Sequence, residues 1–323
     1  MPIRNEAAFI ERSLGAVLAQ DYPAELMEIL VVDGMSNDNT REIVTRFKYY
    51  YPQYSIHILD NPSQIVSTGF NQALQVAKGE VIIRVDGHTE IAPDYVHQCV
   101  LTLQDSQADN VGGRMTAIGV SCFGEAVALA TSTPFGVGGA RFHYSNKKEW
   151  VDTVYLGAWP REVFQRIGLF DEEFVRNQDD EFNYRLREQG GKILLNPSIK
   201  SVYIVRSSAR ALWKQYFQYG FWKVRVLQKH PRQMRGRQFI PPLFVFSLVF
   251  FAIWMLFSPT GFLGLALVIS LYLLANVLAS FITAAKNKWR HLWLLPIVFG
   301  ILHLSYGLGF WVGFFYFLRR WVK

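Results

Sequence analysis

The sequence predicts an α/β domain followed by a helical membrane region, and three observations support this. In the first 90 residues, short β-branched runs alternate with segments of helical spacing, which is typical of βαβ units and a mostly parallel sheet. Long uncharged apolar segments follow residue 239. All 26 acidic residues lie at or before Glu188, together with 16 basic residues, whereas residues 189–323 hold 17 basic residues and no acidic one. The two parts therefore face different surroundings.

The elements of the first part follow from their apolar spacing. Helices are expected at 8–20, 40–47 and 65–77, and strands at 28–32, 55–59 and 80–85. Two of these strands are followed directly by an aspartate: Asp33 follows 28–32, and Asp86 follows 80–85. Ligands of open α/β sheets gather at the carboxyl ends of the strands, so both aspartates are candidate site residues.

The membrane region consists of segments without charge at 240–257, 261–283 and 292–318. Each is long enough to cross about 30 Å of hydrocarbon as a helix, so three transmembrane helices are predicted. If the first part is cytoplasmic, the basic residues of 286–290 lie inside, but those of 319–323 lie outside, against the positive-inside bias. The alternative is that 292–318, which contains proline and several glycines, does not span simply. Both readings stay open.

Residues 192–237 form a basic stretch with 11 basic residues and no acidic one. Within it, aromatic and basic residues interleave over 212–230, which suits a helix in the headgroup layer beside anionic lipid. Nucleic-acid binding is the alternative for such a composition, but the apolar segments that follow at once argue against it. The expected domains are 1–206, an interfacial segment 207–239 and a transmembrane region 240–323.

No signal peptide is expected, because Met1 to Glu11 includes three charged residues and no apolar run of adequate length. The first domain is therefore expected in the cytoplasm, and the whole chain in the cell inner membrane as a multi-pass protein.

Five motifs carry a family resemblance over roughly the first 200 residues. They are PIRNE at 2–6, QDYP at 20–23, VVDGMSNDNT at 31–40, VDGH at 85–88 and NQDDE at 177–181. In this order and spacing they resemble the family-2 glycosyltransferases. The segment QYFQYGFWK at 215–223, followed by a few membrane helices, is most similar to the succinoglycan-type membrane glucosyltransferases. The resemblance implies a GT-A fold, which is Rossmann-like, a nucleotide-sugar donor, a divalent metal and inversion at the anomeric carbon.

A metal suits the expected reaction because a departing nucleoside diphosphate develops negative charge that Mg²⁺ or Mn²⁺ neutralises well. One carboxylate at a strand end suffices to seat such an ion together with substrate phosphates, and imidazole is better tolerated by Mn²⁺. Asp86 is the expected first ligand and His88 the second, with a structural hydrogen bond as the alternative role for His88. Arg84 stands where the family has an acid, so it either contacts a phosphate or pairs with a neighbouring acid.

The nucleotide is expected at the first two motifs. By family analogy Asp33 contacts the base or ribose, and Pro2, Arg4 and Glu6 on the first loop face the same nucleotide. An Arg4–Glu6 salt bridge is the alternative, and Asp38 is expected to cap the helix at 40. Relatives usually open with an apolar strand before the proline, so either the first strand is shortened here or the natural chain is longer. Adding an apolar strand is then expected to raise thermal stability and donor affinity.

An inverting transfer needs a base that takes the proton from the acceptor hydroxyl. The 177–181 cluster opens a helix, and alignment with the family's Glu-Asp pair makes Asp179 the expected base, with Asp180 in reserve. The alternative is that these acids only interact with the helix dipole. Gln178 replaces the family's acid and leaves the choice between the two aspartates open.

The acceptor is expected to meet aromatic side chains. Trp159 either stacks on a sugar or packs in the core. Four residues of the basic stretch are also expected on the acceptor side: Gln215, Tyr219, Trp222 and Lys223. They only partly match the signature of processive synthases, since Arg is expected before the tryptophan, so a long-chain synthase is disfavoured.

The expected function is transfer of a hexose, with glucose favoured, from a uridine diphosphate sugar to a polyprenyl-linked saccharide during exopolysaccharide or glycan assembly. One alternative is a synthase that charges polyprenyl phosphate itself. Another is a noncatalytic membrane scaffold with a GT-A fold, since Arg84 and Gln178 replace acids.

Overall fold

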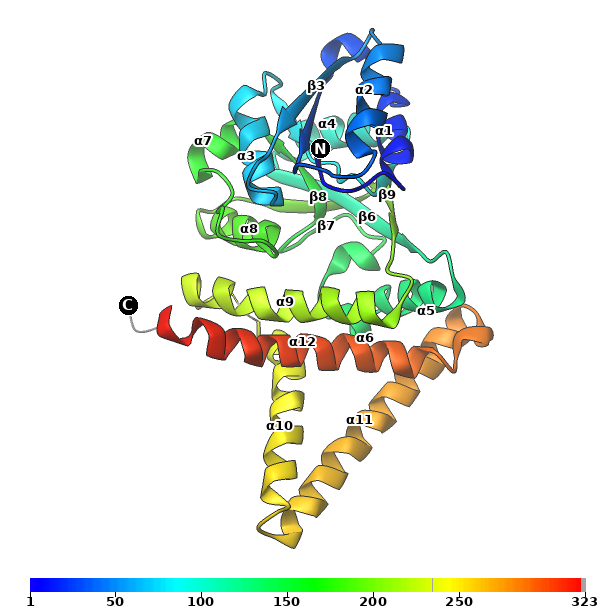
Figure 1. Cartoon of the computed structure of the whole chain (residues 1–323), viewed down its shortest axis with the longest axis vertical. Helices are drawn as coiled ribbons and strands as arrows, with labels where there is room; N and C mark the ends of the chain where they lie inside the picture. The colour runs from blue at the N-terminus through cyan, green and yellow to red at the C-terminus, as the bar shows by residue number, and fades with distance from the viewer. Residues whose placement is uncertain (234, 321–323) are drawn as a thin grey trace. The chain divides into compact units, whose positions relative to one another are not determined.

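The computed structural model describes residues 1–233 and 235–320, which form two compact units (Figure 1). The first comprises Met1–Thr116 and Ala140–Ile204, and the second comprises Ala117–Gly139 and the chain from Val205 onward. The sequence predicts 117–139 as part of the first domain. In the structure, the apolar helix of this segment packs with the helices of the second unit.

A parallel sheet opens the first unit. Its strands are β1 (Pro2–Ile3), β2 (Glu28–Asp33) and β3 (Ser55–Asp60), joined by α1 (Ile10–Leu18) and α2 (Thr40–Tyr50) and followed by α3 (Val66–Val76). Ile3 pairs with Asp33, and Asp33 with Asp60. The βαβ order expected for this part of the chain is therefore present, and it brings Asp33 and Asp60 to one edge.

A second sheet has the strand order β4-β8-β6-β9-β5, with β7 paired to β9. The strands are β4 (Val81–Ile83), β5 (Thr89–Ile91), β6 (Asn110–Ile118), β7 (Glu149–Trp150), β8 (Tyr155–Pro160) and β9 (Ile193–Ile204). The strand expected at 80–85 thus leaves the parallel sheet, since β4 pairs antiparallel with β8. The helices that accompany this sheet are α4 (Tyr95–Ser106), α7 (Glu162–Ile167) and α8 (Gln178–Glu188).

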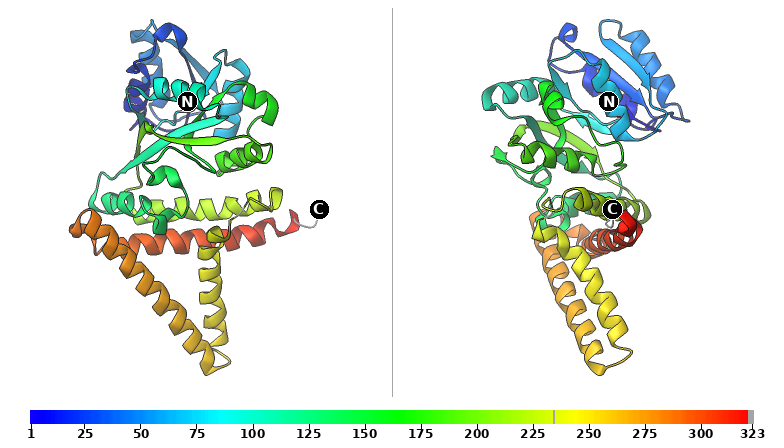
Figure 2. Two further views of the ribbon diagram at one scale, coloured as in Figure 1. Left: turned by 180° about the vertical axis from the view of Figure 1, so that it is seen from behind. Right: turned by 90° about the vertical axis from the view of Figure 1, so that its left-hand side faces the viewer.

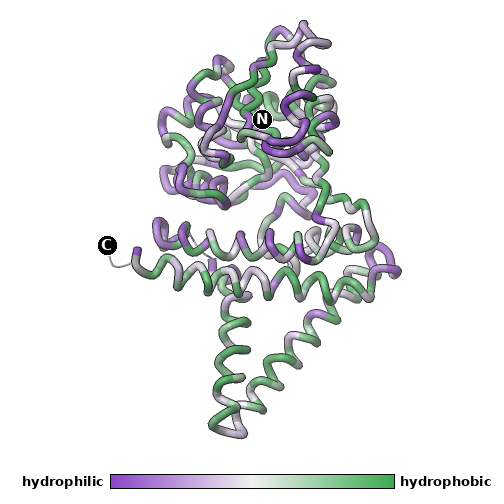
Figure 3. The backbone as a smooth tube through the Cα atoms, in the orientation of Figure 1, coloured by the Kyte–Doolittle hydropathy of each residue, from purple (hydrophilic) through white to green (hydrophobic). Residues whose placement is uncertain are grey.

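The second unit is helical. It contains α5 (Cys122–Thr131), α6 (Pro134–Val137), α9 (Ala209–Lys229), α10 (Ile240–Trp254), α11 (Pro259–Lys286) and α12 (Leu295–Phe317). Within the described residues, three helices are long and apolar enough to cross a membrane: Gly236–Trp254, Pro259–Lys286 and Leu295–Phe317. The three long apolar helices expected in this part of the chain are thus present, and hydrophobic residues predominate along α10 and α11 in Figure 3.

Candidate active site

At the carboxyl edge of the parallel sheet, both carboxylate oxygens of Asp33 have partners within the protein. Asp33 is 1% exposed, and its Oδ1 accepts hydrogen bonds from the Ser36 amide (3.1 Å) and hydroxyl (2.6 Å). Arg41 lies 3.4 Å from the other carboxylate oxygen and also pairs with Asp60. Asp33 thus shapes the loop after β2. The sequence predictions did not include Arg41 and Asp60, although Asp60 ends a predicted strand just as Asp33 does.

The first loop is fastened to the loop after β2. The Glu6 amide donates to Thr40 Oγ1 (2.7 Å), and the Ala7 amide donates to Asp38 Oδ2 (3.2 Å). Asp38 Oδ1 accepts from the Thr40 amide (3.0 Å) at the start of α2, whereas the N-cap position itself is Asn39, whose side chain makes no capping hydrogen bond. The two loops therefore form one polar edge of the first unit.

The nucleotide candidates on the first loop differ in exposure. Pro2 is buried in β1 beside Val32, whereas Arg4 is exposed and lies against Gly34. The expected salt-bridge partner of Arg4, Glu6, instead accepts a hydrogen bond from another side chain of the site, as described below. Arg4 is thus the side chain of this motif that is open to a ligand.

Arg84, Asp86 and Asp179 form a charged cluster. Arg84 Nε donates to Asp86 Oδ1 over 2.7 Å, and its Nη2 donates to Oδ2 over 3.1 Å. Asp179, in the first turn of α8, interacts electrostatically with both. Arg84 is only 7% exposed. Of the two roles that the sequence leaves open for Arg84, the structure shows the pairing with a neighbouring acid.

The pKa values of the two carboxylates in this cluster, Asp86 and Asp179, are shifted in opposite directions. Burial disfavours ionised Asp86, but the charge and hydrogen bonds of Arg84, with smaller contributions from His88 and the N-terminus, together hold the pKa of Asp86 below its ordinary value. Burial dominates at Asp179 and raises its pKa above the ordinary value, although Arg84 opposes the shift. The lowered pKa of Asp86 favours its ionised form, whereas the raised pKa of Asp179 favours proton uptake.

His88 is oriented by the first loop. Its Nδ1 lies 2.8 Å from Glu6 Oε1, and because a carboxylate only accepts hydrogen bonds, Nδ1 carries the proton. In the neutral ring, Nε2 keeps its lone pair, which is the arrangement of histidines that bind metals. The sequence predicts Glu6 as a nucleotide contact, whereas the structure shows it holding His88.

The donor set fits a metal only in part. Within residues 1–233 and 235–320, no group of three or more His, Cys, Asp or Glu side chains is arranged to hold a metal ion. Asp86 retains lone pairs beyond those used by Arg84, and His88 Nε2 is a further donor. Mg²⁺ and Mn²⁺ accept few protein ligands when substrate phosphates complete the shell, so these two residues suit a metal that arrives with a nucleotide.

The acidic residues in the first turn of α8 have different partners. Asp179 Oδ1 accepts the Asp180 amide over 2.9 Å. Glu181 is buried and forms a two-point pair with Arg185, Nε to Oε1 over 2.7 Å and Nη2 to Oε2 over 3.0 Å. Among the described residues, Gln178 Oε1 is one of the buried atoms without a hydrogen-bond partner. Of these residues, Asp179 is the one that shares the Arg84 cluster.

Trp159 belongs to the core, which corrects its expected role at the acceptor. It is 2% exposed, and its ring lies 5.7 Å from Phe164, 6.0 Å from Phe70 and 6.2 Å from Phe182, between ring centres. The aromatic rings that surround it leave no open face for a sugar. The four central residues of β8 are all buried, so both faces of this strand are covered around Trp159, and sequence alone does not reveal this.

The backbone beside Arg84 has an uncommon conformation. Leu156 and Gly157 have φ angles of +63° and +98°, and the Gly157 carbonyl accepts the Arg84 amide over 3.1 Å. A Cβ on Gly157 would lie 2.4 Å from the Trp159 ring. Backbone of this kind persists only where the surroundings enforce it, and it often adjoins functional sites.

Gly157→Ala is expected to destabilise the protein by about 1–3 kcal/mol, because it combines a positive φ with a clash against an immobile buried ring. Thermal unfolding of the purified protein measures this. Gly190→Ala is the matched control, since Gly190 has φ +79° but open space around its Cβ position. Equal losses in both variants would show that the Trp159 contact is unimportant.

The remaining acceptor candidates lie on α9 in the second unit. Gln215 Nε2 donates to Tyr219 Oη over 2.9 Å, and the Trp222 ring lies 5.8 Å from that of Phe317 on α12. Lys223 is 4% exposed. Trp222 thus takes part in the contact between α9 and α12, and the role of all four residues toward an acceptor stays a prediction.

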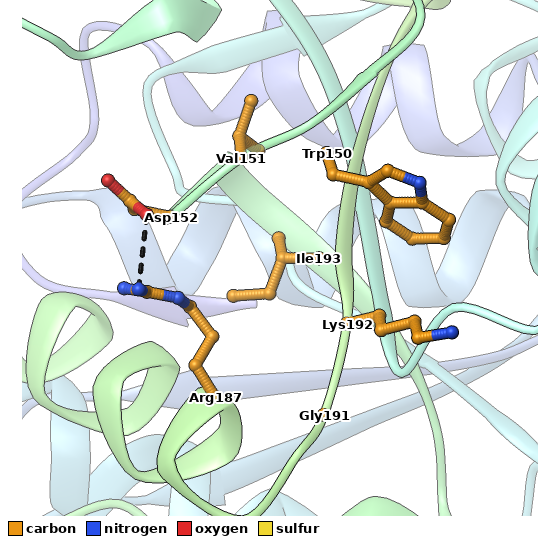
Figure 4. A pocket seen from close by; sticks show the side chains of 7 residues that line it. All are labelled: Trp150, Val151, Asp152, Arg187, Gly191, Lys192 and Ile193. Carbon is orange, nitrogen blue, oxygen red and sulfur yellow. Dashed lines mark ion pairs between the residues drawn. The ribbon is translucent and has the colours of Figure 1, made fainter.

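A cavity of about 330 Å³ lies elsewhere in the first unit, lined by Trp150, Val151, Asp152, Arg187, Gly191, Lys192 and Ile193 (Figure 4). Asp152 and Arg187 form an ion pair of 3.2 Å across it. None of the candidate catalytic or nucleotide residues lines this cavity. It is therefore separate from the charged cluster at Arg84.

A family model described as "Glycosyl transferase family 2" matches residues 1–168, which include every strand-end motif described above. The chain belongs to this family. Together with its long apolar helices, this makes it a membrane-associated family-2 glycosyltransferase. The family expected from the motifs is confirmed.

Two relatives match nearly the whole chain. The succinoglycan biosynthesis protein ExoA of Rhizobium meliloti is 29% identical over 332 residues, covering 99% of this chain and 95% of that protein. The dolichyl N-acetyl-alpha-D-glucosaminyl phosphate 3-beta-D-2,3-diacetamido-2,3-dideoxy-beta-D-glucuronosyltransferase of Methanococcus voltae is 28% identical and covers 97% of this chain and 95% of that protein. The expected likeness to the succinoglycan type is confirmed.

Solved structures confirm the GT-A fold of this family-2 glycosyltransferase. The mannosyltransferase PcManGT from Pyrobaculum calidifontis, in complex with GDP-Man and Mn²⁺, gives a TM-score of 0.59 at 20% identity, covering 96% of this chain and 86% of that one. Residues 1–349 of S. aureus TarS, in complex with UDP-GlcNAc, give 0.53 at 14% identity, covering 99% of this chain and 90% of that one.

Proposed function

We propose that this protein transfers a hexose, with inversion, from a uridine diphosphate sugar to a polyprenyl-linked saccharide. The observation that carries the proposal is the Arg84 cluster, which joins one carboxylate of lowered pKa, Asp86, to one of raised pKa, Asp179. An inverting transfer needs these two kinds of group, one for the leaving side of the sugar and one for the attacking side.

The attacking side is assigned to Asp179. The acceptor hydroxyl oxygen forms a bond to the anomeric carbon while the bond from that carbon to the phosphate oxygen breaks, and its electron pair leaves with the nucleoside diphosphate. The hydroxyl proton passes to Asp179. Its raised pKa brings it closer to neutrality, where a general base is more effective than an ordinary aspartate.

The leaving side is assigned to Asp86 and His88, which would hold a divalent metal. When bound, this ion neutralises the charge that develops on the departing diphosphate. Arg84 keeps Asp86 ionised and fixes its carboxylate plane through two hydrogen bonds. Glu6 holds the His88 ring with Nε2 free. The complex of PcManGT with GDP-Man and Mn²⁺ supports a metal with a nucleotide sugar on this fold.

The lipid character of the acceptor is supported by the second unit. An enzyme whose acceptor is anchored by a polyprenyl chain must work at a bilayer, and the long apolar helices provide this attachment. The name of the Methanococcus relative specifies a dolichyl phosphate sugar as its acceptor, and this chain resembles it over almost its full length.

Replacing Glu6 by Ala is expected to weaken Mn²⁺ binding about 10- to 100-fold, because the partner that orients His88 is lost. Mn²⁺ titration followed by electron paramagnetic resonance, in the presence of uridine diphosphate, measures this independently of turnover. Glu11→Ala, at an exposed position of α1, is the control. Unchanged binding in Glu6→Ala would remove His88 from the metal site.

The function is tested with the full chain in lipid nanodiscs. Labelled uridine and guanosine diphosphate sugars are offered with a polyprenyl diphosphate saccharide or with polyprenyl phosphate. Metal-dependent transfer of a hexose from a uridine donor to the saccharide is expected. Transfer to polyprenyl phosphate alone would instead identify a polyprenyl-phosphate sugar synthase. No transfer and no donor hydrolysis with any pair would support a noncatalytic scaffold.

A further inference from the structure

The helix α12 is long and apolar enough to cross a membrane, yet it does not stand apart as α10 and α11 do. In the spanning windows of α10 and α11, 11% of the residues are buried, whereas in that of α12 the share is 44%. Both views show α12 running beside α9 and across the directions of α10 and α11 (Figures 1 and 2). The packing partner of α12 therefore decides where this helix lies.

The contact between α9 and α12 is close and continuous. A Cβ on Gly220 of α9 would lie 2.0 Å from the Tyr306 carbonyl oxygen. On α12, a Cβ on Gly309 would lie 2.1 Å from the Phe217 carbonyl oxygen, and one on Gly313 would lie 2.5 Å from that of Phe221. Only glycine allows backbones to approach so closely. Phe217 lies beside Gly309, Phe221 beside Gly313, and Gln228 Nε2 donates to the Phe317 carbonyl over 2.9 Å, so the two helices run parallel for several turns.

The partner helix is too polar for the membrane interior. Among its side chains, Arg210, Lys214 and Lys229 are exposed. Basic side chains in the hydrocarbon core are costly, by about 2.5–3.5 kcal/mol each on insertion scales, whereas they favour the layer of anionic headgroups. Because α12 follows α9 along its length, α12 is held in the same layer.

The outward face of α12 suits that layer. Four exposed apolar or aromatic residues recur at helical spacing on one side: Leu308, Val312, Phe315 and Tyr316. Because α9 supplies exposed basic side chains, the pair of helices combines a basic face with the apolar face of α12, which suits the boundary between headgroups and acyl chains. The uncharged α12 and the basic α9 can therefore both lie in the same layer.

The helices α10 and α11 form an antiparallel hairpin. Phe244 stacks on Tyr272 with ring centres 4.2 Å apart, and a Cβ on Gly264 would lie 2.3 Å from the Phe251 ring. The 28 residues of α11 extend about 42 Å, more than the hydrocarbon requires. Its last turns instead contact α12, where Asn276 Nδ2 donates to the Pro296 carbonyl over 3.0 Å.

We propose that only α10 and α11 cross the bilayer, and that α9 and α12 together lie flat on the bilayer surface at the side where the chain enters α10. The ends of both α9 and α12 are then on one side. Arg237 before α10, Lys286 at the end of α11 and Arg320 after α12 all fall on that side, which removes the conflict with the positive-inside bias. This topology does not depend on the proposed reaction.

Cysteine labelling in sealed vesicles of known orientation tests the topology. In a Cys122→Ser background, single cysteines replace Phe257 at the hairpin tip, Asn287 after α11 and Leu318 after α12, all exposed positions. A membrane-impermeant maleimide is expected to label Leu318→Cys from the same side as Asn287→Cys and from the opposite side to Phe257→Cys. Labelling of Leu318→Cys with Phe257→Cys would show that α12 crosses the membrane.

Two further measurements test the position of α12 without relying on the labelling of Leu318→Cys alone. A cysteine appended after the last residue reports the same side as Leu318→Cys, even if Leu318→Cys reacts poorly. Gly309→Val is expected to lower the melting temperature of the solubilised protein, whereas Gly300→Val is not, because a Cβ at Gly300 meets open space. Equal melting temperatures for both variants would contradict the close pairing of α12 with α9.

Discussion

Replacing Asp179 by Asn is expected to reduce kcat about 100- to 10,000-fold, the usual contribution of a general base. The amide keeps the shape of the side chain but cannot take the proton of the acceptor hydroxyl. Donor binding, measured by calorimetry with the nucleotide sugar, should change little, because Asp86 and Arg84 remain paired. Asp180→Asn is the matched control, and a larger loss there would move the base to Asp180.

The same Asp179→Asn variant is expected to unfold at a higher temperature than the wild type at pH 7. The pKa of Asp179 is raised in the folded protein, so the folded state binds a proton more tightly than the unfolded chain does. This group therefore costs stability once the pH rises above its unfolded pKa near 3.9, and the neutral amide removes the cost. Thermal unfolding between pH 4 and pH 8 measures it, and a lower melting temperature at pH 7 would contradict the assigned shift.

Arg84→Met is expected to destabilise the protein by about 3–5 kcal/mol, because it leaves the Asp86 carboxylate without its partner in a buried site. The aliphatic replacement preserves most of the volume, so the loss reports on charge. Chemical denaturation of the detergent-solubilised protein gives the free energy of unfolding.

Arg166→Met is the control for this substitution. Arg166 also pairs with an aspartate, Asp109, but its side chain is 48% exposed, so a change of about 0–1 kcal/mol is expected. In the double variant Arg84→Met with Asp86→Asn, most of the lost stability should return. If the double variant is as unstable as Arg84→Met, the damage lies in packing and the pair is not its cause.

Much of the candidate site follows from short-range sequence patterns. A β-branched run that ends at Asp33 defines a strand end, and parallel βαβ order places such ends at one edge, where Ile3, Asp33 and Asp60 are indeed in register. The partner of Arg84 lies only two residues away, at Asp86, so this pairing was already among the expected alternatives. Local spacing is sufficient for features of this kind.

Other features depend on which residues meet across the chain. Glu6 and His88 are 82 residues apart, and their hydrogen bond gives Glu6 a role that the first motif alone does not indicate. The sequence leaves open whether Trp159 stacks on a sugar or packs in the core, and the rings of α3, α7 and α8 enclose it. Burial is a property of the assembled sheet and helices, and the sequence of a single strand does not contain it.

The sequence by itself determined the family, the order of strands and helices around the nucleotide motifs, and the presence of three helices apolar enough for a membrane. These features depend on residue types and on the spacing of apolar residues along the chain. Only the tertiary structure decided that Asp179 joins Arg84 and Asp86 and that α12 pairs with α9. Length and hydropathy describe a helix in isolation, whereas its position also depends on the glycine faces and basic side chains of the helix that it contacts.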